Sequence, residues 1–139
     1  ARFEAMLVTA WNEGRPDPVT AFGNIGKAYL AFARSEPAYY GAMFEAGLPL
    51  ADHLELKEAG DRALLVLKTA AEAVCRRLQP GRSPPPLMVA LHLWALAHGI
   101  AALFGRGDGA RRSLPMPAED LLEAGLLVYL DGLGLDRTA

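Results

Sequence analysis

LMVALHLWALAHGIAALF, residues 87–104, is an almost continuously apolar stretch built largely from strong helix formers. A helix that is apolar on every side must lie in the centre of its own domain or share one face with a partner. In a chain of 139 residues, a shared face is the better explanation. The stretch therefore predicts a helical protein that associates with another chain.

The same stretch is long enough to be compared with a membrane span. However, it contains His92 and His98, and three prolines precede it. Histidines inside a membrane are rare and costly, and the positive flanks at both ends define no orientation. The single cysteine, Cys75, is compatible with a reducing compartment. We therefore expect a cytoplasmic protein without membrane contact.

The composition of the whole chain points to the same class of fold. Ala and Leu dominate while β-branched residues are sparse, which favours an all-α protein. A net charge of -2 excludes a basic surface for nucleic acid on this chain. Hydrophobic residues make up 52% of the sequence, more than a small monomer needs, and this again indicates a partner.

Glycine and proline divide the chain into about six helical segments. Asp17 before Pro18 predicts the start of one helix, and Asp52 with Glu55 forms a capping box at another. We expect one domain, residues 1–139, folded as an all-α bundle. Its last two long helices should form a four-helix interface with a second copy. The expected helices are residues 2–13, 18–35, 37–47, 52–78, 87–104 and 117–133.

No spacing in the sequence predicts catalysis or metal binding. His92 and His98 lie about 240° apart around a helix, so they cannot bind one metal from the same face. The glycine-rich residues 105–109 lack the Gly-Lys-Ser/Thr ending of a phosphate-binding loop. We therefore expect no enzyme activity, no metal and no cofactor.

Aromatic and methionine side chains on several expected helices are candidates for a small-molecule pocket. Such pockets are mostly apolar and contain a few polar atoms that orient the ligand. An aromatic stripe at helical spacing is more often part of a filled core, so this alternative stays open. The candidate pocket residues are Trp11, Tyr29, Tyr40, Met43, Phe44, Trp94 and His98, of which Tyr29, Tyr40, Trp94 and His98 can supply polar atoms.

Two patterns in the chain resemble those of TetR-type transcriptional regulators. Residues 28–44 contain A-Y-x-x-F-A followed by P-x-x-Y-x-x-M-F. Residues 94–99 contain W-x-x-x-H-G, which is similar to the signature of the WHG-type C-terminal domain of these regulators. The two patterns occur in the order found in that family.

The resemblance implies an all-α domain that binds a small molecule and forms a homodimer. Regulators of this family bind DNA through an N-terminal helix-turn-helix, and the bound molecule changes the spacing of the two DNA-binding heads. No basic recognition helix precedes Arg2. We therefore expect DNA binding only of an intact protein that carries the missing N-terminal domain.

The resemblance also implies roles for individual residues. Trp94 and His98 match the signature, and we expect their side chains to be buried with N–H groups bonded to helix carbonyls. Residues of the last two expected helices are candidates for the dimer interface. These are Leu91, Ala95, Leu122, Leu126 and Tyr129.

Two alternatives stay open beside the regulator. A dimerisation module without a ligand would have a filled core, so a cavity of a few hundred Å³ would exclude it. A small helical enzyme or carrier for an apolar molecule would need a perturbed acid or base in its pocket. We expect the effector of a regulator to be apolar or aromatic and uncharged, because no cluster of like charges falls on the expected inner faces.

Overall fold

The computed structural model describes residues 2–44, 54–104 and 114–135, with the backbone alone at Met43 and Phe44. This part of the chain forms six α-helices and a short 3-10 turn, and it contains no strand. The prediction of an all-α bundle of about six helices is therefore confirmed. The elements are α1 (Arg2–Trp11), η1 (Asn12–Gly14), α2 (Pro18–Ser35), α3 (Pro37–Phe44), α4 (Leu54–Cys75), α5 (Pro86–Phe104) and α6 (Ala118–Gly132).

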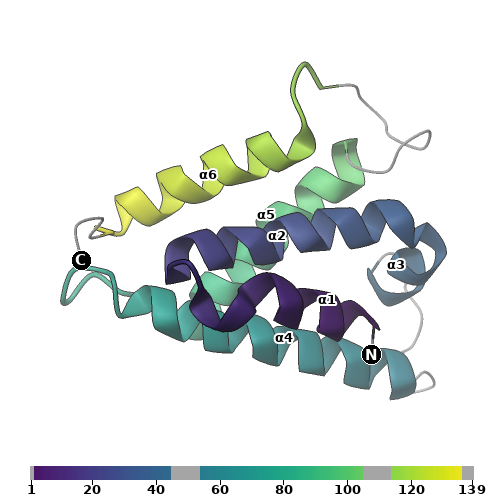
Figure 1. Ribbon diagram of the computed structural model, residues 1–139, viewed down its shortest axis with the longest axis horizontal. Coiled ribbons are helices and arrows are strands. Elements are labelled where there is room, and N and C mark those ends of the chain that lie inside the picture. Colours follow the sequence, from purple (N-terminus) through teal and green to yellow (C-terminus); the bar gives the residue numbers. More distant parts are fainter. Residues whose placement is uncertain (1, 45–53, 105–113, 136–139) are drawn as a thin grey trace.

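Helix α2 is the centre of the bundle and contacts each of the other five helices. In Figure 1, α1 and α4 lie on one side of α2, α6 lies on the other side, and α5 passes behind it. The short α3 closes one end. Helix α2 holds this position because its apolar residues bury more than one face, among them Phe22, Ile25, Tyr29 and Phe32.

The start of α2 follows from its cap. The Asp17 carboxylate accepts a hydrogen bond of 2.9 Å from the backbone N–H of Thr20 and one of 2.8 Å from the Thr20 hydroxyl. Pro18 occupies the first turn, where the missing N–H costs nothing. Both ends of α2 therefore lie where the sequence predicted them.

The first helix ends earlier than predicted. Helix α1 stops at Trp11, and a 3-10 turn replaces its last expected residues. Asn12, Glu13 and Gly14 all have positive φ, which reverses the chain toward α2. An α-helix cannot continue through three such residues, because their backbone is left-handed.

Helix α4 buries the stripe that its apolar spacing predicts, with the exception of Leu64. The spacing places Leu64, Leu67, Ala71, Val74 and Leu78 on one stripe, and all of these are buried except Leu64, which is half-buried. Small residues occupy much of the buried face and let α1 and α5 approach closely. The buried residues are Ala59, Ala63, Leu67, Ala70, Ala71 and Val74. The helix ends at Cys75, and Leu78 forms an isolated antiparallel bridge with Leu135.

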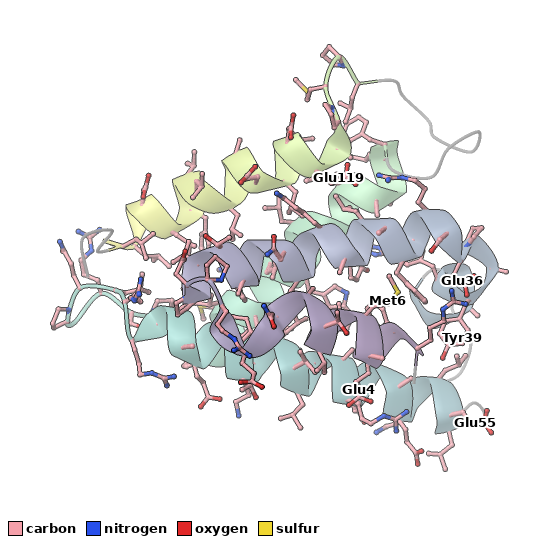
Figure 2. The ribbon with its side chains drawn as sticks, viewed as in Figure 1. Glu4, Met6, Glu36, Tyr39, Glu55 and Glu119 are labelled. Atoms are coloured by element: carbon pink, nitrogen blue, oxygen red, sulfur yellow. The ribbon has the colours of Figure 1, made fainter. Side chains whose placement is uncertain are left out.

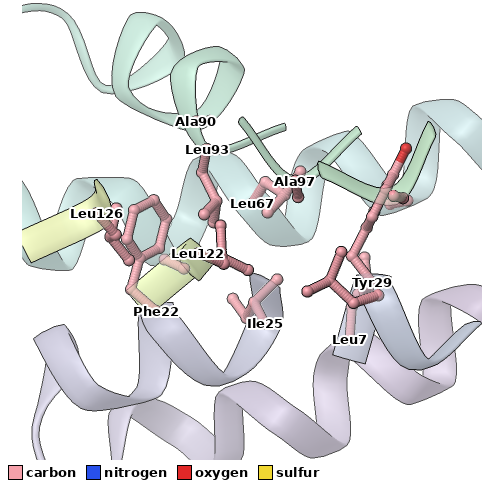
Figure 3. Packing of buried hydrophobic residues seen from close by; sticks show 14 of the residues in the cluster. Leu7, Phe22, Ile25, Tyr29, Leu67, Ala90, Leu93, Ala97, Leu122 and Leu126 are labelled. Carbon is pink, nitrogen blue, oxygen red and sulfur yellow. The ribbon is translucent and has the colours of Figure 1, made fainter. Parts of the chain in front are cut away.

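Helix α6 packs against α2 through leucines that point into the core. Leu122 is 1% exposed and Leu126 is 3% exposed. Figure 3 shows Leu126 beside Phe22 and Leu122 between Ile25 and Leu93. These leucines tie the last helix to its own chain.

Charged side chains cover the outside of the bundle, as Figure 2 shows for Glu4, Glu36 and Glu119. In the described residues, four ion pairs join separate parts of the chain: Arg2 with Glu36 at 2.7 Å, Arg62 with Glu4 at 3.1 Å, Arg34 with Glu119 at 2.9 Å, and Lys27 with Glu123 at 3.6 Å. Exposed pairs of this kind contribute little to stability. The apolar core therefore holds the helices together.

Candidate ligand-binding groove

Helix α5 has one face in the core and one face uncovered in the single chain. Its core face packs on α2 and α4 and consists of Val89, Ala90, Leu93, Ala97, Ile100 and Ala101. The opposite face exposes Leu87, Met88, Leu91 and Leu103 by 41% to 47%. Among the described helices, α5 is the one long and apolar enough to cross a membrane, and core helices of soluble proteins meet the same criterion.

Four of the predicted pocket residues meet at α5 in one polar cluster. The Trp94 indole N–H donates to the Tyr29 hydroxyl at 3.2 Å, and that hydroxyl donates to the Tyr40 hydroxyl at 3.2 Å. His98 Nδ1 lies 3.1 Å from the Tyr29 oxygen and 2.5 Å from the Tyr40 oxygen. Tyr29, Tyr40, Trp94 and His98 therefore form one network, although they come from three helices.

The turn between α2 and α3 positions the two tyrosines. The backbone N–H of Glu36 bonds to the Phe32 carbonyl at 2.8 Å, and Pro37 then begins α3. Tyr40 thereby returns toward Tyr29, with ring centroids 5.6 Å apart and planes at 84°. Figure 3 shows the Tyr29 hydroxyl directed toward α5. Both tyrosines are buried, at 4% and 0% exposure.

The hydrogen-bond partners of Trp94 and His98 differ from the prediction. We expected helix carbonyls, but the Trp94 N–H and His98 Nδ1 meet tyrosine hydroxyls. The two signature residues are also half-buried rather than buried. The reason is that α2 and α3 place both phenols against the side of α5, and a phenol can accept as well as donate.

One assignment of protons uses each donor once. Trp94 donates to Tyr29, Tyr29 donates to Tyr40, and Tyr40 donates to His98 Nδ1. A neutral imidazole that accepts at Nδ1 carries its own proton at Nε2. In this assignment, the buried tyrosines fix the tautomer of His98.

Next to this cluster lies a hollow of about 430 Å³ that is open to the outside. The described residues that line it are Leu91, Trp94, Ala95 and His98, all on α5. Its volume falls within the usual range of small-molecule pockets. Leu91, Trp94 and Ala95 carry no ionisable group, so the described lining is mostly apolar.

Where α1, α2, α4 and α5 meet, by contrast, side chains fill almost all of the space. A void of only about 10 Å³ lies between α1, α2, α4 and α5, beside Leu7, Ile25 and Leu67. A void of this size holds at most one water molecule. A ligand therefore has room on the outer side of α5 and not in this central space.

A second hollow, of about 420 Å³, lies between the C-terminal end of α2 and the start of α6. Arg34 and Glu119 line it and form an ion pair with each other. Burial raises the pKa of Glu119, but backbone hydrogen bonding and the Arg34 guanidinium outweigh it, so the pKa is lowered. The two charges thus pair with one another, so the described part of this lining carries no net charge.

Of the other predicted pocket residues, Trp11 lies outside the network. Trp11 lies at the end of α1, where its ring covers Gly14. The side chains of Met43 and Phe44 lie outside the described residues. The helical spacing of the sequence places Trp11 on the inward face of the first helix. It does not show where along the bundle the Trp11 side chain lies.

The predicted interface residues occupy three environments. Leu91 and Ala95 are exposed and line the hollow of about 430 Å³ on α5. Leu122 and Leu126 are buried within the chain, so they are not on its surface. Tyr129 is half-buried and bonds to His92 Nδ1 at 2.6 Å, which links α6 to α5.

The His92–Tyr129 pair was not predicted from the sequence. Burial, and secondarily the nearby Cys75, raises the pKa of Tyr129. The phenol therefore keeps its proton at neutral pH while it is hydrogen-bonded to His92. No sequence signal pairs two residues on separate helices in this way. Within the described residues, no group of three His, Cys, Asp or Glu side chains is placed to hold a metal ion.

Comparison with known families places the chain beside a described group of domains. A family model described as "Tetracyclin repressor-like, C-terminal domain" matches residues 22–129. The matched region includes all four residues of the polar cluster. Neither the comparison with curated proteins nor the comparison with solved structures gave a match.

Proposed function

Because the chain belongs to the family of tetracycline repressor-like C-terminal domains, we propose that it is the effector-sensing and homodimerisation domain of a cytoplasmic transcriptional regulator. The membership confirms the family predicted from the A-Y-x-x-F-A and W-x-x-x-H-G patterns. Residues 1–139 would form this one domain. Binding to DNA would belong to an N-terminal helix-turn-helix of the intact protein.

The observation that carries effector binding is the polar cluster at the edge of an apolar hollow. Trp94 and His98 belong both to the cluster and to the lining of the hollow. An apolar surface with a few oriented polar atoms is typical of a small-molecule site. The effector we propose is uncharged and apolar or aromatic.

Dimerisation is supported by the uncovered apolar surface of α5 and α6. Val128 on α6 is 74% exposed, and Met88 and Leu91 on α5 are 47% and 41% exposed. Among the described residues, no atom beyond the backbone of its own helix and its chain neighbours lies within 4 Å of a Cβ placed at Gly99, which leaves space for another helix to approach. The dimer surface we propose consists of Met88, Leu91, Ala95, Gly99, Val128 and the exposed part of Tyr129.

Regulation would follow from a population shift. A ligand that binds one dimer geometry better than another moves the equilibrium toward it and so alters DNA affinity. Tyr29 also packs against Phe3 of α1, with ring centroids 5.8 Å apart. A change in the cluster therefore reaches the first helix of the chain through direct contact.

A dimerisation module without a ligand is the second candidate, and the nearly filled central space favours it. We propose no catalytic role, because His98 is the single titratable side chain among the described lining residues. Light scattering and thermal denaturation separate these functions. A dimer whose melting temperature rises with uncharged aromatic compounds supports the sensor. A dimer that responds to none of them supports the module, and a monomer at micromolar concentration contradicts both.

A further inference from the structure

Two buried residues behind the hollow of about 430 Å³ contact one of the side chains that line it. Tyr29 and Tyr40 are 4% and 0% exposed, and neither is among the described lining residues. Their hydroxyl oxygens lie 3.1 Å and 2.5 Å from Nδ1 of His98, which does line the hollow. The His98 ring on α5 is therefore held from the core side by α2 and α3.

These contacts define the orientation of the His98 ring. The ring centroids of Tyr40 and His98 are 5.7 Å apart, and the two planes meet at 27°. A half turn of the imidazole about its Cβ–Cγ bond would exchange Nδ1 for the carbon Cδ2, which is no hydrogen-bond acceptor. Both phenols would then lose Nδ1 as an acceptor in a buried setting, which is unfavourable.

The balance of donors and acceptors in the cluster favours one tautomer of His98. When Nδ1 carries no proton, the Trp94 N–H and the two phenol O–H groups meet three acceptors, namely the two phenol oxygens and Nδ1. A proton on Nδ1 would bring a fourth donor to the same two phenol oxygens. The geometry therefore favours a neutral ring with its proton on Nε2.

The tautomer decides what the other edge of the His98 ring can bind. An imidazole with its proton on Nε2 donates there, so any group that bonds to this edge must accept, whether it belongs to the chain or to a bound molecule. A site built to form a hydrogen bond with its ligand rejects an analogue that lacks the matching group. A ring with a fixed orientation and a fixed proton is therefore a source of specificity.

We propose that Tyr29 and Tyr40 are positioning residues of the effector site, which act through His98 and select an effector with a hydrogen-bond acceptor, such as a carbonyl. This inference rests on the proposed function, which supplies the effector. It adds that the specificity of the hollow depends on two side chains outside its described lining.

The two phenols can replace one another as the donor to His98. Tyr40 lies nearer to Nδ1, and Tyr29 can donate to the same nitrogen when the Tyr40 hydroxyl is removed. Each single change to phenylalanine should therefore keep the proton on Nε2, and only the loss of both hydroxyls should release the ring. A role of the tyrosines in packing alone predicts no link between these hydroxyls and the proton of His98.

Nitrogen-15 spectra of the imidazole side chains measure the tautomer directly. The chain has three histidines, and the signals of His98 are those that disappear in His98→Gln. At a pH where the ring is neutral, we expect the parent to show a protonated Nε2 and an Nδ1 that accepts. Tyr40→Phe should shift the Nδ1 signal and leave the proton on Nε2, whereas Tyr29→Phe/Tyr40→Phe should show a mixture of tautomers. Tyr39→Phe is the matched control, because Tyr39 is 40% exposed on the same helix as Tyr40.

Two probe compounds of the same shape test the acceptor of the effector. Fluorenone and fluorene are both flat and uncharged, and fluorenone has a carbonyl where fluorene has a methylene group. In equilibrium dialysis, we expect the parent to bind fluorenone about two- to tenfold more tightly than fluorene, which is the range of one net hydrogen bond. This preference should persist in each single variant and in Tyr39→Phe, and it should vanish in the double variant.

Three results would overturn the proposal. A parent with its His98 proton on Nδ1 refutes the tautomer. A folded double variant that keeps the Nε2 proton and the preference for fluorenone shows that the tyrosines set neither. A double variant that binds both compounds more weakly by the same factor assigns the tyrosines to packing. If circular dichroism shows that the double variant is unfolded, the Nδ1 signal of Tyr40→Phe decides, since a shifted signal supports the bond and an unchanged one refutes it.

The same measurements separate this inference from the proposed function. If His98 has the expected tautomer but the parent binds neither compound, a sensor of uncharged aromatic molecules is contradicted, and the tyrosines have no effector to select. If the parent binds fluorenone while the His98 proton is on Nδ1, the sensor stands and the role of the tyrosines is wrong.

Discussion

At the scale of single residues, the Tyr29 hydroxyl is the centre of the site. It accepts from Trp94, donates to Tyr40 and lies beside His98 Nδ1. Residue type alone identified the polar members of this cluster, because Tyr, Trp and His combine an apolar ring with a polar atom. Their meeting depends on how α3 turns back on α2, which no local pattern encodes.

Tyr29→Phe should destabilise the protein although it removes one atom. The change leaves the Trp94 N–H and the Tyr40 hydroxyl without their shared partner in a buried setting. We expect a loss of about 1–3 kcal/mol in the free energy of unfolding, measured by urea denaturation. Tyr39→Phe is the control, because Tyr39 is 40% exposed and the same change should cost less than about 0.5 kcal/mol. Equal effects of both changes would contradict the role of the network.

Asp17→Ala tests the helix cap and its dependence on pH. The backbone N–H of Thr20, followed by its hydroxyl, lowers the pKa of Asp17 below 3.8. A lowered pKa in the folded state means that the stabilisation is complete above the unfolded pKa and disappears as the pH falls through the folded value. We expect a loss of about 1 kcal/mol at neutral pH. In urea denaturation at decreasing pH, the difference from the parent should shrink toward zero in acid, and a difference that grew there would refute the assignment.

At the scale of helices, the contact between α2 and α6 depends on Gly26, whose role the sequence did not reveal. A Cβ at Gly26 would lie 2.7 Å from Leu122 Cδ2 and 3.3 Å from Leu93 Cδ1. A Cβ at Gly23 would lie 3.8 Å from Leu126 Cδ2, an ordinary contact. Glycine inside a predicted helix indicates a position of low helix propensity. Only the packing of α6 on α2 explains why Gly26 is needed.

Gly26→Ala and Gly23→Ala should therefore change stability in opposite directions. Both changes raise helix propensity by about 1 kcal/mol. At Gly26, the clash with a packed leucine costs about 1–3 kcal/mol, so we expect a net loss. At Gly23 the gain in propensity should remain. Thermal denaturation of the two variants provides the comparison, and a Gly26→Ala variant more stable than Gly23→Ala would show that Leu122 moves aside freely.

The sequence predicts the end of a helix where a side chain determines it. It predicts the buried face of a helix less well. Asp17 and Pro18 fix the start of α2 through bonds within four residues. The buried face of α4 follows instead from the helices packed on it, which select Ala63 and Ala70 over the larger Leu64. Close packing is a property of the assembled bundle, so local hydrophobic spacing placed this face only approximately.

At the scale of the whole molecule, the high apolar content of the sequence is divided between the core and the surface. Much of it forms the core around α2. Another part lies on the outside of α5 and α6, where Met88, Leu91 and Val128 are exposed. The sequence predicted that the last two helices share a face with a partner, but it placed Leu122 and Leu126 there, because spacing along α6 could not separate the side that meets α2 from the side that stays uncovered.

If a second copy covers this surface, folding and association are coupled, and the melting temperature must depend on protein concentration. With typical unfolding enthalpies for a chain of this size, a tenfold rise in concentration should raise the melting temperature of the parent by about 2–3 °C. Val128→Glu should melt at one temperature over the same range, since a monomer has no such coupling. Leu65→Glu, on exposed α4, should follow the parent. Differential scanning calorimetry at several concentrations makes the measurement, and a parent whose melting temperature does not change would mean that the apolar surface of α5 and α6 is not covered by a second copy.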